Sequence, residues 1–185
     1  MSRIGNKVIV ISSGVKVDIK GQLITIDGPK GKLTYNIHSD ITVSISDGKI
    51  FVKRPTENKL HKSLHGVTRA NISNMIDGVT VGFQKTLAII GIGFKAFVEN
   101  DKFTLQVGFT HPVVFNIPQG ITIKVEKQTA ITLSGSDKQL LGEFTAKIRA
   151  VRPPEPYKGT GIRYTNEYVR KKVGKAAITA GTGGK

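Results

Sequence analysis

The sequence predicts an α+β protein with two tandem related domains, each an antiparallel β-sheet covered by one helix, and a basic C-terminal arm. Three features support this class. Alternating apolar and polar residues predict strands, a stripe with helical spacing follows each set of strands, and this order repeats after about eighty of the 185 residues. We place the domains at residues 1–82 and 83–152 and the arm at 153–185.

Strands open the first repeat. Alternation between apolar and polar residues predicts half-buried strands, and Gly21 separates the first two. Asp47-Gly48 suits a two-residue hairpin turn, because both positions tolerate positive φ. The strands expected in this repeat span residues 15–20, 22–27, 33–37, 41–46 and 50–52.

A helix follows the strands of the first repeat. Pro55 ends the strands because it has no N–H to donate to a sheet. Thr56 is the expected N-cap, with Glu57 favourable beside the helix dipole, and Asp77-Gly78 is the expected end. The stripe expected to face the sheet consists of Leu60, Leu64, Val67, Asn71 and Met75.

The second repeat becomes visible when the sequence is shifted by eighty positions. Leu33–Ile37 then aligns with Val113–Ile117, and Asp40–Val43 aligns with Gly120–Ile123. Ser136–Gln139 fits the capping box of a second helix, which the following prolines end. The apolar face expected on this helix consists of Leu140, Leu141, Phe144, Ile148 and Val151.

Composition restricts the function. There are 28 Lys and Arg against 13 Asp and Glu, a net charge of +15, and there is no Cys. The lack of Cys excludes a disulfide-stapled module, a Cys-ligated zinc site and a thiol nucleophile. No apolar run approaches the roughly 20 residues that span a bilayer, and the N-terminal residues show no cleavage pattern. We therefore expect a soluble, intracellular protein with a polyanionic partner.

The positive charge is concentrated at one end. Residues 1–82 carry 12 basic and 6 acidic side chains, residues 83–146 carry 6 and 5, and residues 147–185 carry 10 and 2. A nearly neutral middle rich in β-branched residues indicates a folded scaffold. A basic end on such a scaffold is typical of an arm that binds nucleic acid, and a tail that only aids solubility is the simpler alternative.

Three motifs that carry chemistry in other proteins have simpler explanations here. Gly91–Ala96 matches a dinucleotide fingerprint, but no helix has room to begin there, so its glycines indicate a bulge or a close backbone approach. Gly28–Lys32 lacks the first glycine of a phosphate loop and is expected to be a solvated basic turn. His61 and His65 share a helix face without a third zinc ligand, so we expect surface residues or a polar face. We predict no cofactor, metal or catalytic residue, and so no enzyme.

The strongest functional pattern is the segment from Lys147 to Lys175. Its three prolines favour extended backbone, while Gly159 and Gly161 allow tight bends or close approach to a ligand. Three tyrosines alternate with Lys and Arg along it. Cations bind phosphates, and Tyr rings can stack on unpaired bases, so the pattern predicts an ordered arm that follows a nucleic-acid surface.

The segment RPPEPYKGTGIRY, from Arg152 to Tyr164, resembles the signature of the bacterial-type family of the sixth protein of the large ribosomal subunit. The resemblance covers nearly the whole chain in order. Thr160 departs from it, because the family usually has Lys there, and Ala176–Lys185 runs beyond the usual end. The other segments that resemble the family are Met1–Gly5, Gly28–Gly31, His65–Ala70, Gly91–Phe94 and Val107–Pro112.

The resemblance implies a structural constituent of the large ribosomal subunit that binds 23S rRNA near the stalk base and the sarcin–ricin loop. It implies support for subunit assembly and for the region where translation factors dock. Neighbouring large-subunit proteins are the implied partners, translational GTPases lie nearby, and neither a membrane nor a small-molecule substrate is implied. The implied location is the ribosome, in the cytoplasm or in an organelle.

Residues for rRNA binding follow from the resemblance by position. They are Lys95, His111, Lys147, Arg149, Arg152, Tyr157, Lys158, Gly159, Arg163, Tyr164, Arg170, Lys171 and Lys172. Two other classes of function stay open at this point. A freestanding nucleic-acid-binding protein would bind duplex DNA as tightly as rRNA, and an enzyme acting on RNA would need catalytic groups that the sequence does not reveal.

Overall fold

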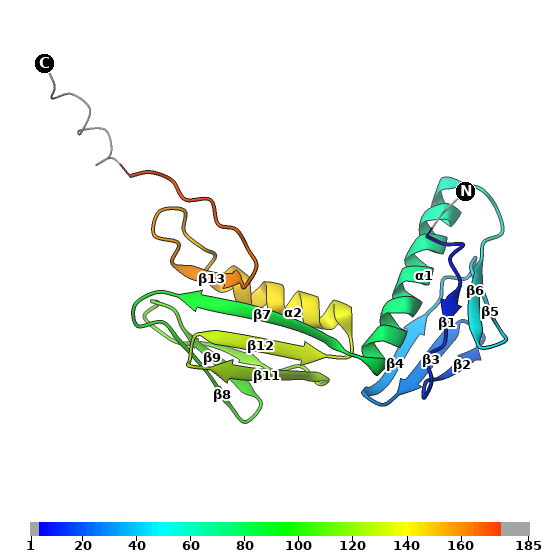
Figure 1. The fold of residues 1–185 in the computed structure, drawn as a ribbon, viewed down its shortest axis with the longest axis horizontal. Coiled ribbons are helices and arrows are strands. Elements are labelled where there is room, and N and C mark those ends of the chain that lie inside the picture. The colour runs from blue at the N-terminus through cyan, green and yellow to red at the C-terminus, as the bar shows by residue number, and fades with distance from the viewer. Residues whose placement is uncertain (1–3, 175–185) are drawn as a thin grey trace, which may run out of the picture. The chain divides into compact units, whose positions relative to one another are not determined.

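A computed structural model describes residues 4–174 of the chain (Figure 1). Contacts within it define two units. The first consists of residues 4–83 together with 135–141, and the second of residues 84–134 and 142–174. The N-terminal Met1–Arg3 and the C-terminal extension Ala176–Lys185, both noted in the sequence, lie outside the described residues.

The first unit contains two three-stranded sheets where the sequence predicted one. One sheet has the order β2-β3-β4 and the other β1-β6-β5. Asp47 and Gly48 have φ of 51° and 69°, so the predicted hairpin turn between β5 and β6 is confirmed. The strands are β1 (Ile9–Val10), β2 (Lys16–Lys20), β3 (Leu23–Gly28), β4 (Gly31–Asn36), β5 (Thr42–Ser46) and β6 (Lys49–Lys53).

Helix α1 (Lys59–Thr80) packs on β3, β4 and β6, but both predicted ends were wrong. The helix begins after Asn58, and Thr56 instead accepts a bond from the Asn58 N–H. It also continues through Gly78, which is buried inside it. The turn that ends the helix lies at Gly82, where φ is 77° and the N–H reaches the carbonyl of Asp77.

The face of α1 that meets the core agrees with the predicted stripe only at Met75, which is buried, and at Leu64, which packs against the core. Leu60 and Val67 are 60% and 53% exposed, whereas His65 and Thr68 are buried. The buried stripe is shifted by one residue toward the C-terminus. It includes the polar residues His65 and Thr68, so its pattern did not look apolar in the sequence. The residues of α1 buried in the core are His65, Thr68, Ile72, Met75, Ile76, Gly78 and Val79.

His65 is a buried core residue, contrary to the surface position expected for it. Its Nε2 lies 2.9 Å from the carbonyl oxygen of Val52, and its Nδ1 lies 3.0 Å from a guanidinium nitrogen of Arg54. Because Arg54 can only donate, Nδ1 must accept and Nε2 must donate. His61 is partly buried, with Nε2 3.2 Å from a carboxylate oxygen of Asp40. Both rings therefore hold the first unit together.

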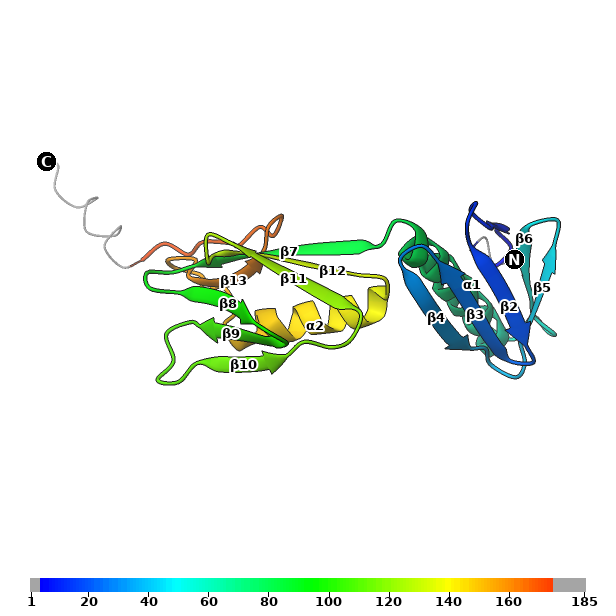
Figure 2. The same cartoon turned by 90° about the horizontal axis from the view of Figure 1, so that it is seen from below.

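The second unit repeats the order of the first. Its sheets have the orders β10-β9-β8 and β11-β12-β7-β13. Helix α2 (Lys138–Val151) lies against the strands of this unit (Figure 2). The rings of Phe115 on β10 and Phe144 on α2 meet edge to face at 6.1 Å. The strands are β7 (Phe83–Ile90), β8 (Lys95–Glu99), β9 (Lys102–Gln106), β10 (Val113–Asn116), β11 (Ile121–Glu126), β12 (Ala130–Gly135) and β13 (Gly161–Tyr164).

The N-cap of α2 is Asp137, one residue later than the capping box predicted. Its Oδ1 accepts bonds from the N–H groups of Gln139 and Leu140, at 2.8 and 3.2 Å. Leu141, Phe144 and Ile148 are buried as expected. In the described residues, 4–174, neither helix is long and apolar enough to cross a membrane.

The predicted repeat is confirmed by equivalent elements and equivalent turns. β2-β3-β4 corresponds to β8-β9-β10, and in each unit a β5-β6 or β11-β12 pair leads into the helix. The N–H of Ile41 bonds the carbonyl of His38, and eighty residues later the N–H of Ile121 bonds the carbonyl of Pro118. The fold class is therefore α+β, with the same topology used twice.

One strand was not predicted. β13, which the sequence analysis placed in the arm, pairs antiparallel with β7, so that Gly161 lies opposite Ile90 and Tyr164 opposite Leu87. Ile162 is completely buried in the core of the second unit. Part of the basic segment is thus a strand of the second unit's sheet.

Candidate functional site

The basic segment leaves α2, forms a closed loop and returns as β13. Within the loop, the N–H of Glu155 bonds the carbonyl of Thr160 at 2.9 Å, and the N–H of Gly159 bonds the carbonyl of Glu155 at 3.0 Å. The Thr160 hydroxyl also donates to the Glu155 carboxylate, at 3.0 Å. Thr160, which the sequence analysis noted as a departure from the resemblance, therefore has a side chain that closes the loop.

Gly161 makes a close backbone approach to the protein itself, where the sequence suggested a tight bend or an approach to a ligand. Its φ is 137°, and a Cβ placed on it would lie 2.6 Å from the carbonyl oxygen of Pro153. The N–H of Ile162 then bonds the carbonyl of Arg152 at 2.8 Å. Glycine at 161 is what allows the loop to close onto the end of α2.

Arg149 and Glu167 fix the chain beyond β13 to helix α2. The Nε of Arg149 donates to one oxygen of Glu167 at 2.8 Å, and a terminal nitrogen donates to the other oxygen. The same carboxylate accepts the N–H of Tyr164 at 3.1 Å. The hydrogen bonds from Arg149 lower the pKa of Glu167, against the opposing effect of burial, and the bonds to Glu167 raise the pKa of Arg149.

Two other predicted RNA-binding side chains are also engaged within the protein. The ring of Tyr164 has the amine of Lys85 at 5.8 Å and the guanidinium of Arg149 at 5.9 Å from its centre. The guanidinium of Arg152 lies 5.5 Å from the centre of the Phe109 ring. Arg149 and Tyr164 are thus partly buried and contact other residues of the protein, whereas Arg152 remains exposed to solvent.

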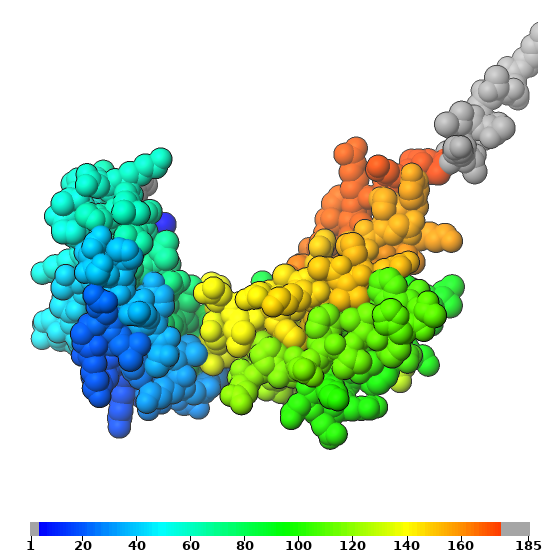
Figure 3. All heavy atoms as spheres, turned by 180° about the vertical axis from the view of Figure 1, so that it is seen from behind, coloured from blue at the N-terminus to red at the C-terminus, as the bar shows by residue number. Residues whose placement is uncertain are grey.

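The exposed cations lie on the loop and on the chain after β13. Tyr157 and Tyr168 are 56% and 89% exposed. The N–H of Lys172 bonds the carbonyl of Pro156 at 2.8 Å, so the two segments lie side by side. Figure 3 shows them, orange to red, standing out from the second unit. The exposed side chains brought together here are Tyr157, Lys158, Tyr168, Arg170, Lys171 and Lys172.

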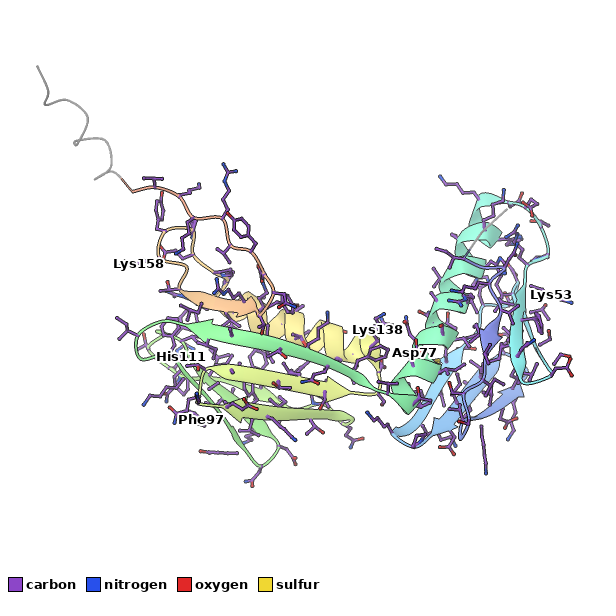
Figure 4. All side chains as sticks on the ribbon, in the orientation of Figure 1. Lys53, Asp77, Phe97, His111, Lys138 and Lys158 are labelled. Carbon is purple, nitrogen blue, oxygen red and sulfur yellow. The ribbon has the colours of Figure 1, made fainter. Side chains whose placement is uncertain are left out.

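The remaining predicted residues are distributed over the second unit. Lys95 begins β8 and His111 lies between β9 and β10, both exposed. Figure 4 shows His111 and Lys158 at the same end of the second unit. Lys147 points to solvent from α2, with its amine 2.7 Å from the carboxylate of Glu143. Arg163 is half-buried in β13.

The other motifs keep structural roles. Phe94 packs against Gly91, where a Cβ would lie 2.5 Å from its ring, so the close approach predicted for this glycine is confirmed. The basic turn at Lys30 is not simply solvated, because its amine donates to the carbonyl of Val81 at the end of α1. Over residues 4–174, no group of three or more His, Cys, Asp or Glu side chains is arranged to hold a metal ion.

Sequence reasoning missed Glu167 and Lys85. An acid within a basic segment carries no sequence signal for a particular partner, and Arg149 lies eighteen residues away. Lys85 meets Tyr164 only because β7 and β13 pair. Both contacts depend on a strand pairing between distant parts of the chain.

Replacing Glu167 by Gln is expected to weaken RNA binding by about tenfold, although it raises the net charge by one. The variant loses the ion pair between Glu167 and Arg149, which fixes the chain after β13 to α2. The segment carrying Arg170 must then lose conformational freedom when it binds RNA, and this loss weakens binding. The stability that Glu167 contributes is fully present above the ordinary glutamate pKa of 4.5, and it is lost as the pH falls through the lowered pKa of Glu167. Filter binding to a 23S rRNA transcript measures the affinity.

Glu143→Gln is the matched control. Like Glu167→Gln, this variant replaces one acid of the second unit. Glu143, however, lies on α2 and pairs with the exposed Lys147, not with Arg149. Its RNA affinity should stay the same or rise slightly. Equal behaviour of the two variants would show that charge alone, and not the position of the segment, sets the affinity.

Comparison with known proteins identifies the family. The model of the family described as Ribosomal protein L6 matches residues 11–82 and 90–165, one match for each repeat. The chain is 50% identical to the large ribosomal subunit protein uL6 of Lactiplantibacillus plantarum over 95% of its length and 98% of that protein. It is also 50% identical to uL6 of Enterococcus faecalis over the same shares, and 49% identical to uL6 of Carboxydothermus hydrogenoformans over 100% of its length and 98% of that protein. The chain therefore belongs to the ribosomal protein L6 family.

Proposed function

We propose that this protein is a structural constituent of the large ribosomal subunit, where it binds 23S rRNA near the base of the stalk and the sarcin–ricin loop. Its partners there are rRNA and neighbouring large-subunit proteins, close to where translational GTPases dock, in the ribosome of the cytoplasm. The relatives named uL6 support the assignment to this subunit. The observation that carries RNA binding is the group of exposed cations on the loop and after β13.

The electrostatics of this segment favour a polyanion. Its two acids, Glu155 and Glu167, are both engaged by neighbours within the protein. The cations after β13 remain exposed, and Lys172 is held beside the loop through its backbone. Neutralising phosphates with positioned cations releases counterions, which provides affinity that falls with salt. Contacts to unpaired bases or RNA shape provide the specificity.

Sedimentation of a native extract through a sucrose gradient tests the proposal. We expect the chain to migrate with the large subunit at low salt and through moderate salt. Migration at the top of the gradient in both conditions would overturn the ribosomal assignment. Release only at high salt would agree with binding through phosphates.

A competition experiment distinguishes this proposal from the alternative that the chain is a freestanding nucleic-acid-binding protein. Duplex DNA at equal nucleotide concentration should displace the protein from a 23S rRNA transcript only weakly. Equal displacement by DNA and by rRNA would favour the freestanding binder.

A further inference from the structure

The loop Gly91–Phe94 presents an isoleucine to solvent without any structural need. Ile92 is fully exposed, with a relative exposure of 103%, whereas Phe94 packs its ring against Gly91 and Gly108. A Cβ on Gly108 would lie 3.0 Å from that ring, so this ring joins the loop to the neighbouring one. Gly93 has φ of 76°, and the N–H of Phe94 reaches the carbonyl of Gly91. Ile92 is thus held outward on an anchored loop.

Three loops meet at this end of the second unit. The Phe94 ring connects residues 91–95 with residues 107–112. The guanidinium of Arg152 lies over Phe109, which connects residues 107–112 with the loop 152–161. Pairing of Gly161 with Ile90 brings the end of that loop beside the start of the first. An apolar centre of Ile92 and the 44% exposed Phe109 therefore lies among loops from distant parts of the chain.

The surroundings of this centre are cationic. Lys95 is exposed on the first of these loops, His111 on the second, and Arg152 and Lys158 on the third. The only acid of these loops is Glu155, whose carboxylate accepts the hydroxyl of Thr160. An apolar tip with a cationic rim is complementary to RNA, whose wide and shallow minor groove exposes ribose and base edges between two rows of phosphates.

We propose that Ile92 is an apolar contact to RNA, placed against ribose and base edges while the surrounding cations bind the flanking phosphates. This inference rests on the proposed function and adds a contact that carries no charge. Apolar wedges of this kind are used by proteins that bind minor grooves. The Gly91-Ile92-Gly93 motif then has a role that neither a cofactor site nor the fold gives it.

Ile92→Lys separates an apolar contact from simple charge attraction. The variant adds a cation at the centre of the rim, so attraction alone would strengthen binding to a 23S rRNA transcript spanning the stalk base and the sarcin–ricin loop. We expect binding about tenfold weaker instead, as the lost burial of an isoleucine side chain indicates. Val114→Lys is the matched control, since Val114 is a 51% exposed apolar residue on β10, outside the three loops. It should bind as tightly as the wild type or slightly more tightly.

Salt dependence provides a second readout. Ile92→Ser should lower the affinity without changing the slope of log affinity against log salt, because no phosphate contact is lost. Ile92→Leu, which keeps an apolar side chain, should bind as tightly as the wild type. Unchanged affinity in both Ile92→Lys and Ile92→Ser would overturn this inference. Failure of the wild type to prefer the transcript over unrelated duplex RNA would instead overturn the proposed function, so the two failures are distinguishable.

Discussion

Replacing Arg170, Lys171 and Lys172 by Gln is expected to weaken binding to a 23S rRNA transcript by about 10²-fold near 0.1 M salt. All three side chains are exposed on the chain after β13. If each contacts one phosphate, the slope of log affinity against log salt falls by about 2–3, and the affinity at 0.1 M falls by several-fold for each contact. Titrations between 50 and 200 mM salt measure both quantities.

The control for this triple variant removes the same charge elsewhere in the second unit. Lys102, Lys124 and Lys127 are exposed on or beside β9 and β11, and none of them belongs to the loop or to the chain after β13. Their replacement by Gln should change the affinity by only a few-fold through the long-range field. Equal losses in the two triple variants would contradict a localised contact surface.

Gly161→Ala is expected to destabilise the second unit by about 3–4 kcal/mol. The new Cβ would lie 2.6 Å from the carbonyl oxygen of Pro153 and 2.9 Å from that of Arg152. Both are backbone atoms, so relief requires β13 to shift along β7 and to expose Ile162. Thermal unfolding followed by circular dichroism should show a melting temperature lower by roughly 10 °C.

Gly159→Ala is the control that isolates the energetic cost of a positive φ from the cost of the close backbone contact at Gly161. Gly159 has φ of 74°, but a Cβ there meets no atom within 4 Å. Its replacement should therefore cost only about 1 kcal/mol. Hydrogen exchange of the β7 amides should accelerate in Gly161→Ala alone. Similar exchange in both variants would mean that β13 contributes little to the sheet.

The sequence predicted the strands and the repeat well because these depend on local periodicity. The turn at Asp47-Gly48 and the strand predicted at 22–27, observed at Leu23–Gly28, required only alternation and turn chemistry. The sequence also predicted where the two helices lie, but it did not predict the buried face of α1 or the N-caps of either helix correctly. His65 and Thr68 occupy core positions, and their hydrogen-bonding groups made the buried face of α1 look polar.

The candidate site was predictable in composition but not in arrangement. Local sequence showed that Tyr157 and Lys171 belong to a basic, tyrosine-containing segment. It could not separate the exposed cations from Arg149, whose partner Glu167 is positioned by β13. The pairing of β13 with β7 joins residues about seventy positions apart, which no local pattern records. The rRNA contacts of the individual residues stay predictions.

The position of β13 has a consequence for the order in which the chain is made. Synthesis proceeds from the N-terminus, so β7 emerges long before its partner at Gly161–Tyr164. Until then one edge of β7 has free N–H and C=O groups that another chain could pair with. The nascent protein reaches its finished sheet only when the segment proposed to bind rRNA has been translated. Completion of the sheet and completion of the proposed rRNA-binding segment therefore coincide during synthesis.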